Sequence, residues 1–460
     1  MASPAGALAA WAGELAFADL PADVVETTKL RLLDVIGLAL AGLGTDFGES
    51  VRAGACALDA GGPARILGSG DAVGTATAAL ANGALAQALE FDDTHNESIV
   101  HISAPSVAAA LALAEARPVS GRELIAAVAV GNEISCRVGS VAPGQFHRRG
   151  FHPTGLFAAF GATYLAGRVL GLSAAQMANA AGIAGSFAAG ILQCWVDGTQ
   201  SKYLHPGWAA HGGLVAAHLA QAGTTGPEAV FEGRFGLFAS HLQDEAVARD
   251  FARITGGLGT LWESRKASFK PYPAAHVIHP YIDALLRLRR AHAIDAAKVR
   301  EIVVPVASYI VGIVCEPAAE KRRPRSDSHA RVSLPYTLAE ALARGRLARD
   351  AYARDALADP EILRLTDAVR LEVDPDFPGP ERFKGQVRIV MADGTIFEEV
   401  EEHNRGSAEN PMTEGEIIAK FDDNVADVLT PDRRRRLVET ALAAELLDSA
   451  RVLTDLSIRS

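Results

Sequence analysis

The sequence predicts a mainly α-helical protein. A large all-helical domain is formed by the N-terminal and C-terminal parts of the chain, and a smaller α+β domain is inserted between them. From residue 7 to about residue 218, apolar residues recur every three and four positions and strand signals are scarce. After Val299, short runs of β-branched residues alternate with helical stretches. Helical spacing returns from Thr413 to Ile458. We therefore expect the helical domain to comprise residues 1–262 and 405–460, and the α+β domain residues 263–404.

The N-terminal part contains the clearest helical patterns, at residues 26–43 and 75–91. Ala and Gly are frequent in both segments, so the helices can approach closely, as in a bundle. Residues 173–195 come closest to a membrane span, but polar residues interrupt them, and we expect a buried, tightly packed helix pair. The first residues lack the basic start of a secretory signal, so a cytoplasmic location is expected.

The inserted domain should contain both strands and helices. Asp393-Gly394 is a typical hairpin turn between two alternating runs. The expected strands are residues 300–314, 369–375 and the hairpin 385–400, and the expected helices are residues 333–345 and 359–369.

Composition excludes several classes of protein. Hydrophobic residues make up 49% and charged residues 22% of the 460 residues, as in soluble globular proteins. The net charge of -11 repels phosphate backbones and anionic membranes, so neither nucleic acid nor a membrane is an expected partner. An acidic substrate would need a site with its own local positive charge.

Familiar cofactor motifs are missing from the sequence. The four cysteines form no CxxC pair, which argues against a zinc ribbon and an iron–sulfur cluster. No P-loop, G-x-G-x-x-G, HExxH or G-x-S-x-G elbow is present. Nucleotide cofactors and a serine hydrolase mechanism therefore have no support in the sequence.

The first chemically capable cluster follows the apolar helix of residues 75–91. Carboxylates at a helix C-terminus are unfavourable unless something pairs with them. The cluster is either a solvated loop or a functional site, and His95, His101 and Asp93 could also hold a divalent ion. Its members are Glu90, Asp92, Asp93, Thr94, His95 and His101.

Two further clusters lie in the helical part. His152 precedes Pro153, a residue suited to the first helical turn, so His152 either caps that helix or stands beside free backbone amides that attract an anion. Lys202, His205 and His211 lie among small residues. A buried lysine is costly unless it meets an anion, so Lys202 is expected to supply the positive charge for an acidic ligand.

The last two clusters lie where the helical spacing of apolar residues gives way to short β-branched runs. Lys270, Tyr272, His276 and His279 fall between the two expected domains, where pockets are common, although an ordinary linker would also explain them. Tyr336 opens a helix of the inserted domain and could offer a phenol to the same cleft; a tyrosine there is also a common core residue.

In this order, the five clusters resemble the motifs of the MmgE/PrpD family, which includes 2-methylcitrate dehydratase, cis-aconitate decarboxylase and iminodisuccinate epimerase. The segments GNEISCRVG and HNRGSAENPMTEGEIIAKF also look like family motifs, so the resemblance covers nearly the whole chain. It implies a helical domain with an α+β lid, a homodimer and catalysis without a cofactor.

The resemblance also implies the residues of an active site in the cleft between the domains. Catalysis would fall to His101, His152, Lys202, His279 and Tyr336, and substrate binding to Glu90, Asp93, Thr94, His205, Lys270, Tyr272 and His276. The sequence departs from the decarboxylase-like pattern D-F-D-D-T because Glu90 replaces the leading Asp. His101 is followed by Ile102 rather than proline, and it lies one residue further from Thr94.

We therefore expect a lyase that acts on a small di- or tricarboxylic acid, as a dehydratase or a decarboxylase. Lys202, the amides near His152 and Lys270 would bind carboxylates, while His152 or His101 moves a proton at carbon, since an unperturbed imidazole has a pKa of about 6.5. The alternatives are an epimerase of a dicarboxylate, a non-catalytic binding protein, and a metal-dependent lyase.

Overall fold

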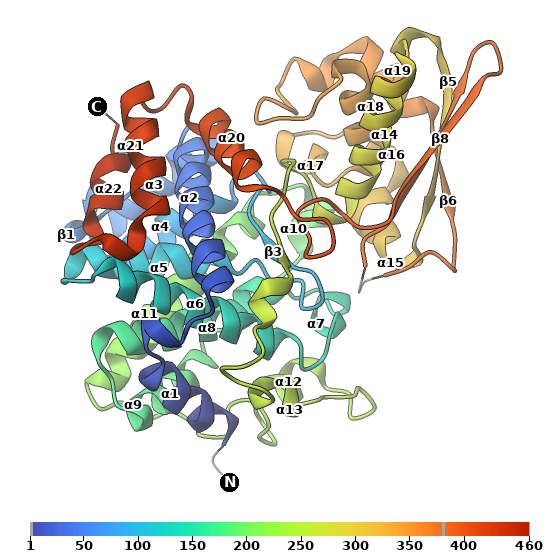
Figure 1. The fold of residues 1–460 in the computed structure, drawn as a ribbon. Coiled ribbons are helices and arrows are strands. Elements are labelled where there is room, and N and C mark those ends of the chain that lie inside the picture. Colours follow the sequence, from blue (N-terminus) through green and yellow to red (C-terminus); the bar gives the residue numbers. More distant parts are fainter. Residues whose placement is uncertain (1–2, 380–381, 460) are drawn as a thin grey trace.

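The computed structural model describes residues 3–379 and 382–459, and it confirms a mainly α-helical protein. Figure 1 shows a large helical part and a smaller part with a sheet, with the C-terminal helices packed beside the N-terminal ones. The helices of the large part are α1 Pro4–Glu14, α2 Ala22–Leu43, α3 Asp46–Leu58, α4 Thr75–Gln87, α5 Ser103–Ala116, α6 Gly121–Gly139, α7 Gln145–Arg148, α8 Pro153–Leu170, α9 Ala174–Ala184, α10 Gln193–Asp197, α11 His205–Gln221, α12 Leu237–Leu242, α13 Ala252–Thr255, α20 Glu414–Val425, α21 Pro431–Leu442 and α22 Arg451–Ser457.

The small part contains a four-stranded sheet in the order β6-β5-β7-β8. Strands β5 and β6 are parallel, and β7 and β8 form the expected hairpin around Asp393-Gly394. The strands are β5 Val299–Val306, β6 Val369–Val373, β7 Gly385–Met391 and β8 Ile396–Glu401; the helices are α14 His279–His292, α15 Ser308–Ile310, α16 Ala318–Arg322, α17 Asp327–Ala330, α18 Leu334–Arg344 and α19 Pro360–Ala368.

Two sequence predictions of secondary structure were wrong. The strand expected over residues 300–314 ends at Val306, and the chain continues as α15 and a π-helical turn, Val311–Cys315. Of the buried helix pair expected over residues 173–195, the second helix begins only at Gln193, because residues 190–192 bond to the backbone at residues 150–152, and Ile191 is exposed rather than buried. A short hairpin, β1 Ala60–Arg65 with β2 Ala72–Val73, was not predicted.

Buried hydrophobic residues form two large clusters. One spans α1 to α13 and the C-terminal helices, of which α20 and α21 pack on α2. The other covers one face of the four-stranded sheet together with α14, α18 and α19. That each cluster corresponds to a domain with the expected boundaries stays a prediction. Within the described residues, no helix is long and apolar enough to cross a membrane.

Close helix packing at α4 and α11 gives a first testable prediction. A Cβ atom at Gly207 would lie 2.0 Å from the carbonyl oxygen of Leu80, so Gly207→Ala forces the two helices apart. We expect the free energy of unfolding to fall by about 1–3 kcal/mol, measured by urea unfolding. Gly54→Ala in α3 is the control, because its Cβ meets nothing within 4 Å and alanine favours a helix. Equal effects of both changes would contradict the prediction.

Candidate active site

The site begins with a small antiparallel pairing that joins distant segments. Strand β3, Thr94–His95, pairs with β4, Ala267–Ser268, so the loop after α4 lies against the chain that enters the small part of the molecule. This pairing brings the first and fourth sequence clusters together. Between the two parts of the structure lies a cavity lined by Glu90, Thr94, Ile99, His101, Gly144, His147, Arg148, His152, Trp195, Lys202, Lys270, Ala275, His276, Val277, Tyr309, Ile313 and Phe383.

Two lysines share one carboxylate in this cavity. The Nζ atom of Lys202 lies 2.5 Å from Glu90 Oε1, and the Nζ atom of Lys270 lies 3.5 Å from the same oxygen and 2.9 Å from the Glu90 carbonyl. All three side chains are buried. Burial alone would raise the pKa of Glu90, but the two ammonium charges outweigh it and hold that pKa far below its usual range. With a single carboxylate between two ammonium groups, the cavity retains positive charge for an anionic ligand.

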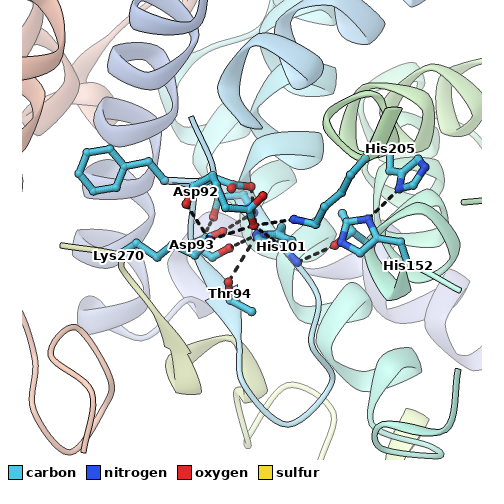
Figure 2. Close-up of polar contacts among 12 residues, drawn as sticks. Asp92, Asp93, Thr94, His101, His152, His205 and Lys270 are labelled. Carbon is cyan, nitrogen blue, oxygen red and sulfur yellow. Dashed lines mark hydrogen bonds and ion pairs between the residues drawn. The ribbon is translucent and has the colours of Figure 1, made fainter. Parts of the chain in front are cut away.

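His101 lies beside this triad, and Figure 2 shows it close to Asp93 and Thr94. Its Nδ1 atom lies 2.9 Å from the Asp93 carbonyl oxygen and 3.4 Å from the hydroxyl of Thr94. A carbonyl oxygen only accepts hydrogen bonds, so Nδ1 carries the proton and Nε2 has a free lone pair. Nε2 lies 4.0 Å from Oε1 of Glu90, and both residues line the cavity. His101 can therefore take up a proton at Nε2 and exchange it with a ligand.

His152 faces His101 across 5.5 Å between ring centroids. It occupies the position before α8, yet its side chain makes no capping bond; its Nδ1 lies 2.9 Å from Nδ1 of His205. The simple capping role considered from the sequence is therefore wrong. Burial, followed by the charge of Lys202, lowers the pKa of His152 well below 6.5, so the ring is neutral at neutral pH. His205 supports His152 from outside the cavity lining.

Two predicted binding residues, and one other residue of the sequence clusters, are occupied elsewhere. Asp93 forms an ion pair with Arg31 and accepts hydrogen bonds from Ser103, so it does not line the cavity. The hydroxyl of Tyr272 donates to Asp283 at 2.7 Å and also lies outside the lining. His211 contacts the carbonyl of Ala76. Each of these side chains holds structure together near the site rather than facing a ligand.

Two residues assigned to catalysis are also not in the cavity. Tyr336 is fully buried in the core of the small part, where its ring packs near Tyr352. His279 donates from Nε2 to the Ala274 carbonyl, and its ring packs behind His276, which does line the cavity. Of the two histidines left open by the sequence, the structure therefore exposes His276 to the cavity. Asn404, from the late family motif, donates to His276 Nε2 at 2.8 Å.

Sequence reasoning missed several residues of the lining. Arg148 lies at the exposed rim, and its guanidinium makes no hydrogen bond or ion pair with any other described residue. Its neighbour His147 packs on Trp195. The basic pair Arg148-Arg149, just before His152, could have indicated from the sequence that an anion binds here. Tyr309 also lines the cavity, but it was hidden in a β-branched run that predicted a strand.

The predicted metal set of His95, His101 and Asp93 does not assemble. In the described part of the chain, His95 instead lies near Glu97 and Glu263. Both acids are already paired, Glu97 with Arg253 and Glu263 with Lys266. The group is separate from the cavity lining, so it offers no support for a metal-dependent reaction there.

Several buried histidines should make the protein sensitive to acid. Burial is the largest cause of their lowered pKa values, which reach about 4 for His95, His147 and His205; the group also includes His152, His276 and His279. In the unfolded chain they bind protons below about pH 6.5, whereas the folded protein keeps them neutral to lower pH. Stability must therefore fall as pH decreases from about 6.5 towards 4.

Each such histidine contributes a loss of about 1.4 kcal/mol per pH unit within that window. We expect the midpoint of thermal unfolding to be nearly constant from pH 7.5 to about pH 6.5 and to fall steadily from there to pH 5. His279→Gln keeps a donor for Ala274 but removes one titrating ring, so its loss with decreasing pH should be shallower. An unfolding midpoint independent of pH would show that these rings are not held neutral.

The fold and the site define the class of protein: mainly helical, with a small α+β part and a buried lysine–histidine cavity between them. The chain belongs to the MmgE/PrpD family. The model of the MmgE/PrpD N-terminal domain matches residues 6–250, and that of the C-terminal domain matches residues 272–446.

Curated relatives match over most of their length. A protein of Aspergillus terreus named cis-aconitate decarboxylase is 29% identical, with 97% of this chain and 94% of the relative aligned. Proteins with the same name from Mus musculus and Homo sapiens are 26% and 27% identical, covering 94% and 82% of this chain and 89% and 78% of their own lengths.

Proposed function

We propose that this protein is a lyase that removes a carboxylate from a small unsaturated tricarboxylic acid of the cis-aconitate type. The observation that carries the proposal is the sharing of Glu90 by Lys202 and Lys270 inside a cavity whose lining also contains four histidines. Two ammonium groups with one carboxylate leave room for a ligand carboxylate. The names of the relatives support the choice of substrate class.

Binding would use three cationic groups along the cavity. Lys202 and Lys270 would bind the carboxylate next to the reacting carbon, where negative charge develops. Arg148 at the rim would bind a distal carboxylate, for which a planar guanidinium is well suited. The buried position of both lysines strengthens their attraction for charge because water screens it little.

The chemical step would then be a carbon–carbon cleavage followed by proton transfer. The bond to the departing carboxylate breaks, carbon dioxide leaves, and the electron pair is delocalised towards the neighbouring carboxylate held by Lys202. A proton that a histidine nitrogen has first taken up from solvent then forms the new carbon–hydrogen bond, and the histidine returns to its neutral form. The Nε2 atom of His101 lies 4.0 Å from Glu90 Oε1, and its Nδ1 atom is bonded to the Asp93 carbonyl, so we assign this transfer to Nε2 of His101.

The same acid–base set supports other outcomes, which one experiment separates. Chelator-treated protein is incubated in heavy water with citrate, 2-methylcitrate, cis-aconitate, and malate-like and aspartate-like acids, and products are followed by proton NMR. We expect loss of a carboxylate from cis-aconitate with one deuterium incorporated. Dehydration of 2-methylcitrate would make the protein a dehydratase, and deuterium exchange without a new product would make it an epimerase.

Two further results would overturn the assignment to a cofactor-free lyase. Ligand-induced line broadening without any conversion would indicate a binding protein. Activity lost on chelation and restored by one metal would indicate a metal-dependent reaction. Lys202→Met is the control for contaminating activity, because any conversion that survives this change unaltered does not come from the cavity.

We also propose that the protein forms a homodimer, as the family resemblance implies. Exposed apolar side chains at and near α10 and α11 support this, since such surfaces are commonly buried between subunits: Ile191, Val196, Leu204 and Trp208. Light scattering tests it, with an expected mass of twice 48.2 kDa.

A further inference from the structure

Asp92 is a buried carboxylate without a conventional partner. Its side chain is fully inaccessible, and neither carboxylate oxygen has a hydrogen-bond partner among the described residues. An isolated buried charge is costly, and most buried polar groups in proteins are satisfied. A carboxylate held in this state therefore needs an explanation, which neither the family resemblance nor the cavity lining supplies.

The other buried acids around it all have cationic partners. Glu90 is bound by Lys202 and Lys270, Asp93 by Arg31, and Asp34 by Lys420 at 2.8 Å. The titratable group in contact with Asp92 is the ring of His101, whose Nδ1 lies 3.3 Å from Asp92 Oδ2. Figure 2 shows Asp92 and His101 side by side, with Asp93 next to them.

The tautomer of His101 determines which ring nitrogen faces Asp92 with a hydrogen and which one can accept a proton. Because Nδ1–H donates to the Asp93 carbonyl, the hydrogen lies on the side of the ring that Asp92 approaches, and Nε2 is left to accept a proton. When Nε2 takes up that proton, an imidazolium forms beside the unpaired carboxylate. The attraction between the two charges then compensates the buried charge of Asp92.

We propose that Asp92 is a positioning residue that holds His101 in the Nδ1–H tautomer and stabilises its protonated form. The proposal rests on the proposed function, and it assigns the two facing histidines different tasks. His101 carries the proton between substrate and enzyme. His152 faces the charge of Lys202 rather than a carboxylate, so it stays neutral and orients the ligand by hydrogen bonding.

The groups around His101 are consistent with this division. Besides Asp92, its ring faces the Glu90 carboxylate at 4.0 Å, the Thr94 hydroxyl at 3.4 Å and the neutral ring of His152. Glu90 is already bound by two lysines. Asp92 is thus the carboxylate near His101 that forms no ion pair with a lysine or arginine among the described residues, although the charge of Lys270 acts on it at longer range.

The test is Asp92→Asn, which keeps the shape of the side chain and removes its charge. We expect kcat on the productive acid to fall on the order of 10²-fold, with KM changed less than about threefold, because the charge acts on the proton-carrying state rather than on ligand binding. The ¹⁵N shifts of the His101 ring, assigned by comparison with His101→Gln, should show the Nδ1–H tautomer in the unchanged protein and a shifted tautomer or protonation balance in the variant.

Asp34→Asn is the matched control, since Asp34 is equally buried near the site but pairs with Lys420. It should lower the unfolding midpoint and leave the His101 ring signals in place. Unchanged kcat together with unchanged His101 signals in Asp92→Asn would overturn the proposal. The NMR readout needs no turnover, so a protein inactive on every acid would refute the proposed function while the Asp92–His101 contact could still be confirmed.

Discussion

Replacing Lys202 by methionine should reduce kcat/KM by about 10²–10³-fold. The methionine keeps most of the volume of the side chain but removes its positive charge. That charge binds a ligand carboxylate and stabilises the negative charge that develops on it during the reaction. Glu90 remains bound by Lys270, so the cavity becomes neutral rather than positive. The charge of Lys202 also contributes to the lowered pKa of His152, which should rise in the variant. Steady-state kinetics on the productive acid measure the effect.

Lys321→Met is the matched control for this change. Lys321 is also buried, but it donates to the Val332 carbonyl in the small part and does not line the cavity. We expect this variant to lose stability and to keep kcat/KM within about threefold when assayed well below its unfolding midpoint. If both lysine variants lost activity equally, the loss at Lys202 would reflect damage to the fold rather than to ligand binding.

Arg31→Met should reduce the free energy of unfolding by about 3–5 kcal/mol, because it leaves Asp93 buried without a cation. Arg31 lies in α2 and is almost inaccessible; besides its ion pair with Asp93, it donates to the Ala267 carbonyl at 2.9 Å. It therefore ties α2 to both strands of the β3–β4 pairing region. Urea unfolding followed by tryptophan fluorescence measures the loss.

The comparison for Arg31 is an exposed ion pair of the same type. Arg346 pairs with Asp350 on the surface, where water screens the charges, so Arg346→Met should cost less than about 1 kcal/mol. A small loss at Arg31 as well would mean that Asp93 is protonated or finds another partner. A large loss confirms that Asp93 is a structural anchor of the active-site loop.

Much of the helical architecture could be predicted from local pattern. The spacing of apolar residues gave α2 and α4, and Asp-Gly between alternating runs gave the β7–β8 hairpin. Prediction failed at residues 300–314, where a β-branched run changes from strand to helical turns halfway along. Nothing in side-chain propensity marks that point, because the strand ends where its pairing with the neighbouring strands ends.

In the candidate site, too, some features could be predicted from the sequence and others could not. Residue type alone favoured a functional role for Lys202, because a buried ammonium needs an anion. His152, His101 and Lys270 were assigned to the site through the family resemblance, since a structural role was also open for each. The direction in which each side chain points could not be predicted from the sequence. Tyr336 points into the core and Tyr309 into the cavity, and Asp93 is taken by Arg31, which lies 62 residues away in the sequence.

The sequence by itself thus determined the mainly helical class, the family resemblance and the chemical character of the site, because these follow from periodicity, charge and residue type. Only the tertiary structure decided which acids are paired, which histidine faces the cavity and which carboxylate is left for His101. These depend on contacts between residues far apart in the chain, such as the β3–β4 pairing, and the cost of burying an unpaired charge makes those contacts decisive.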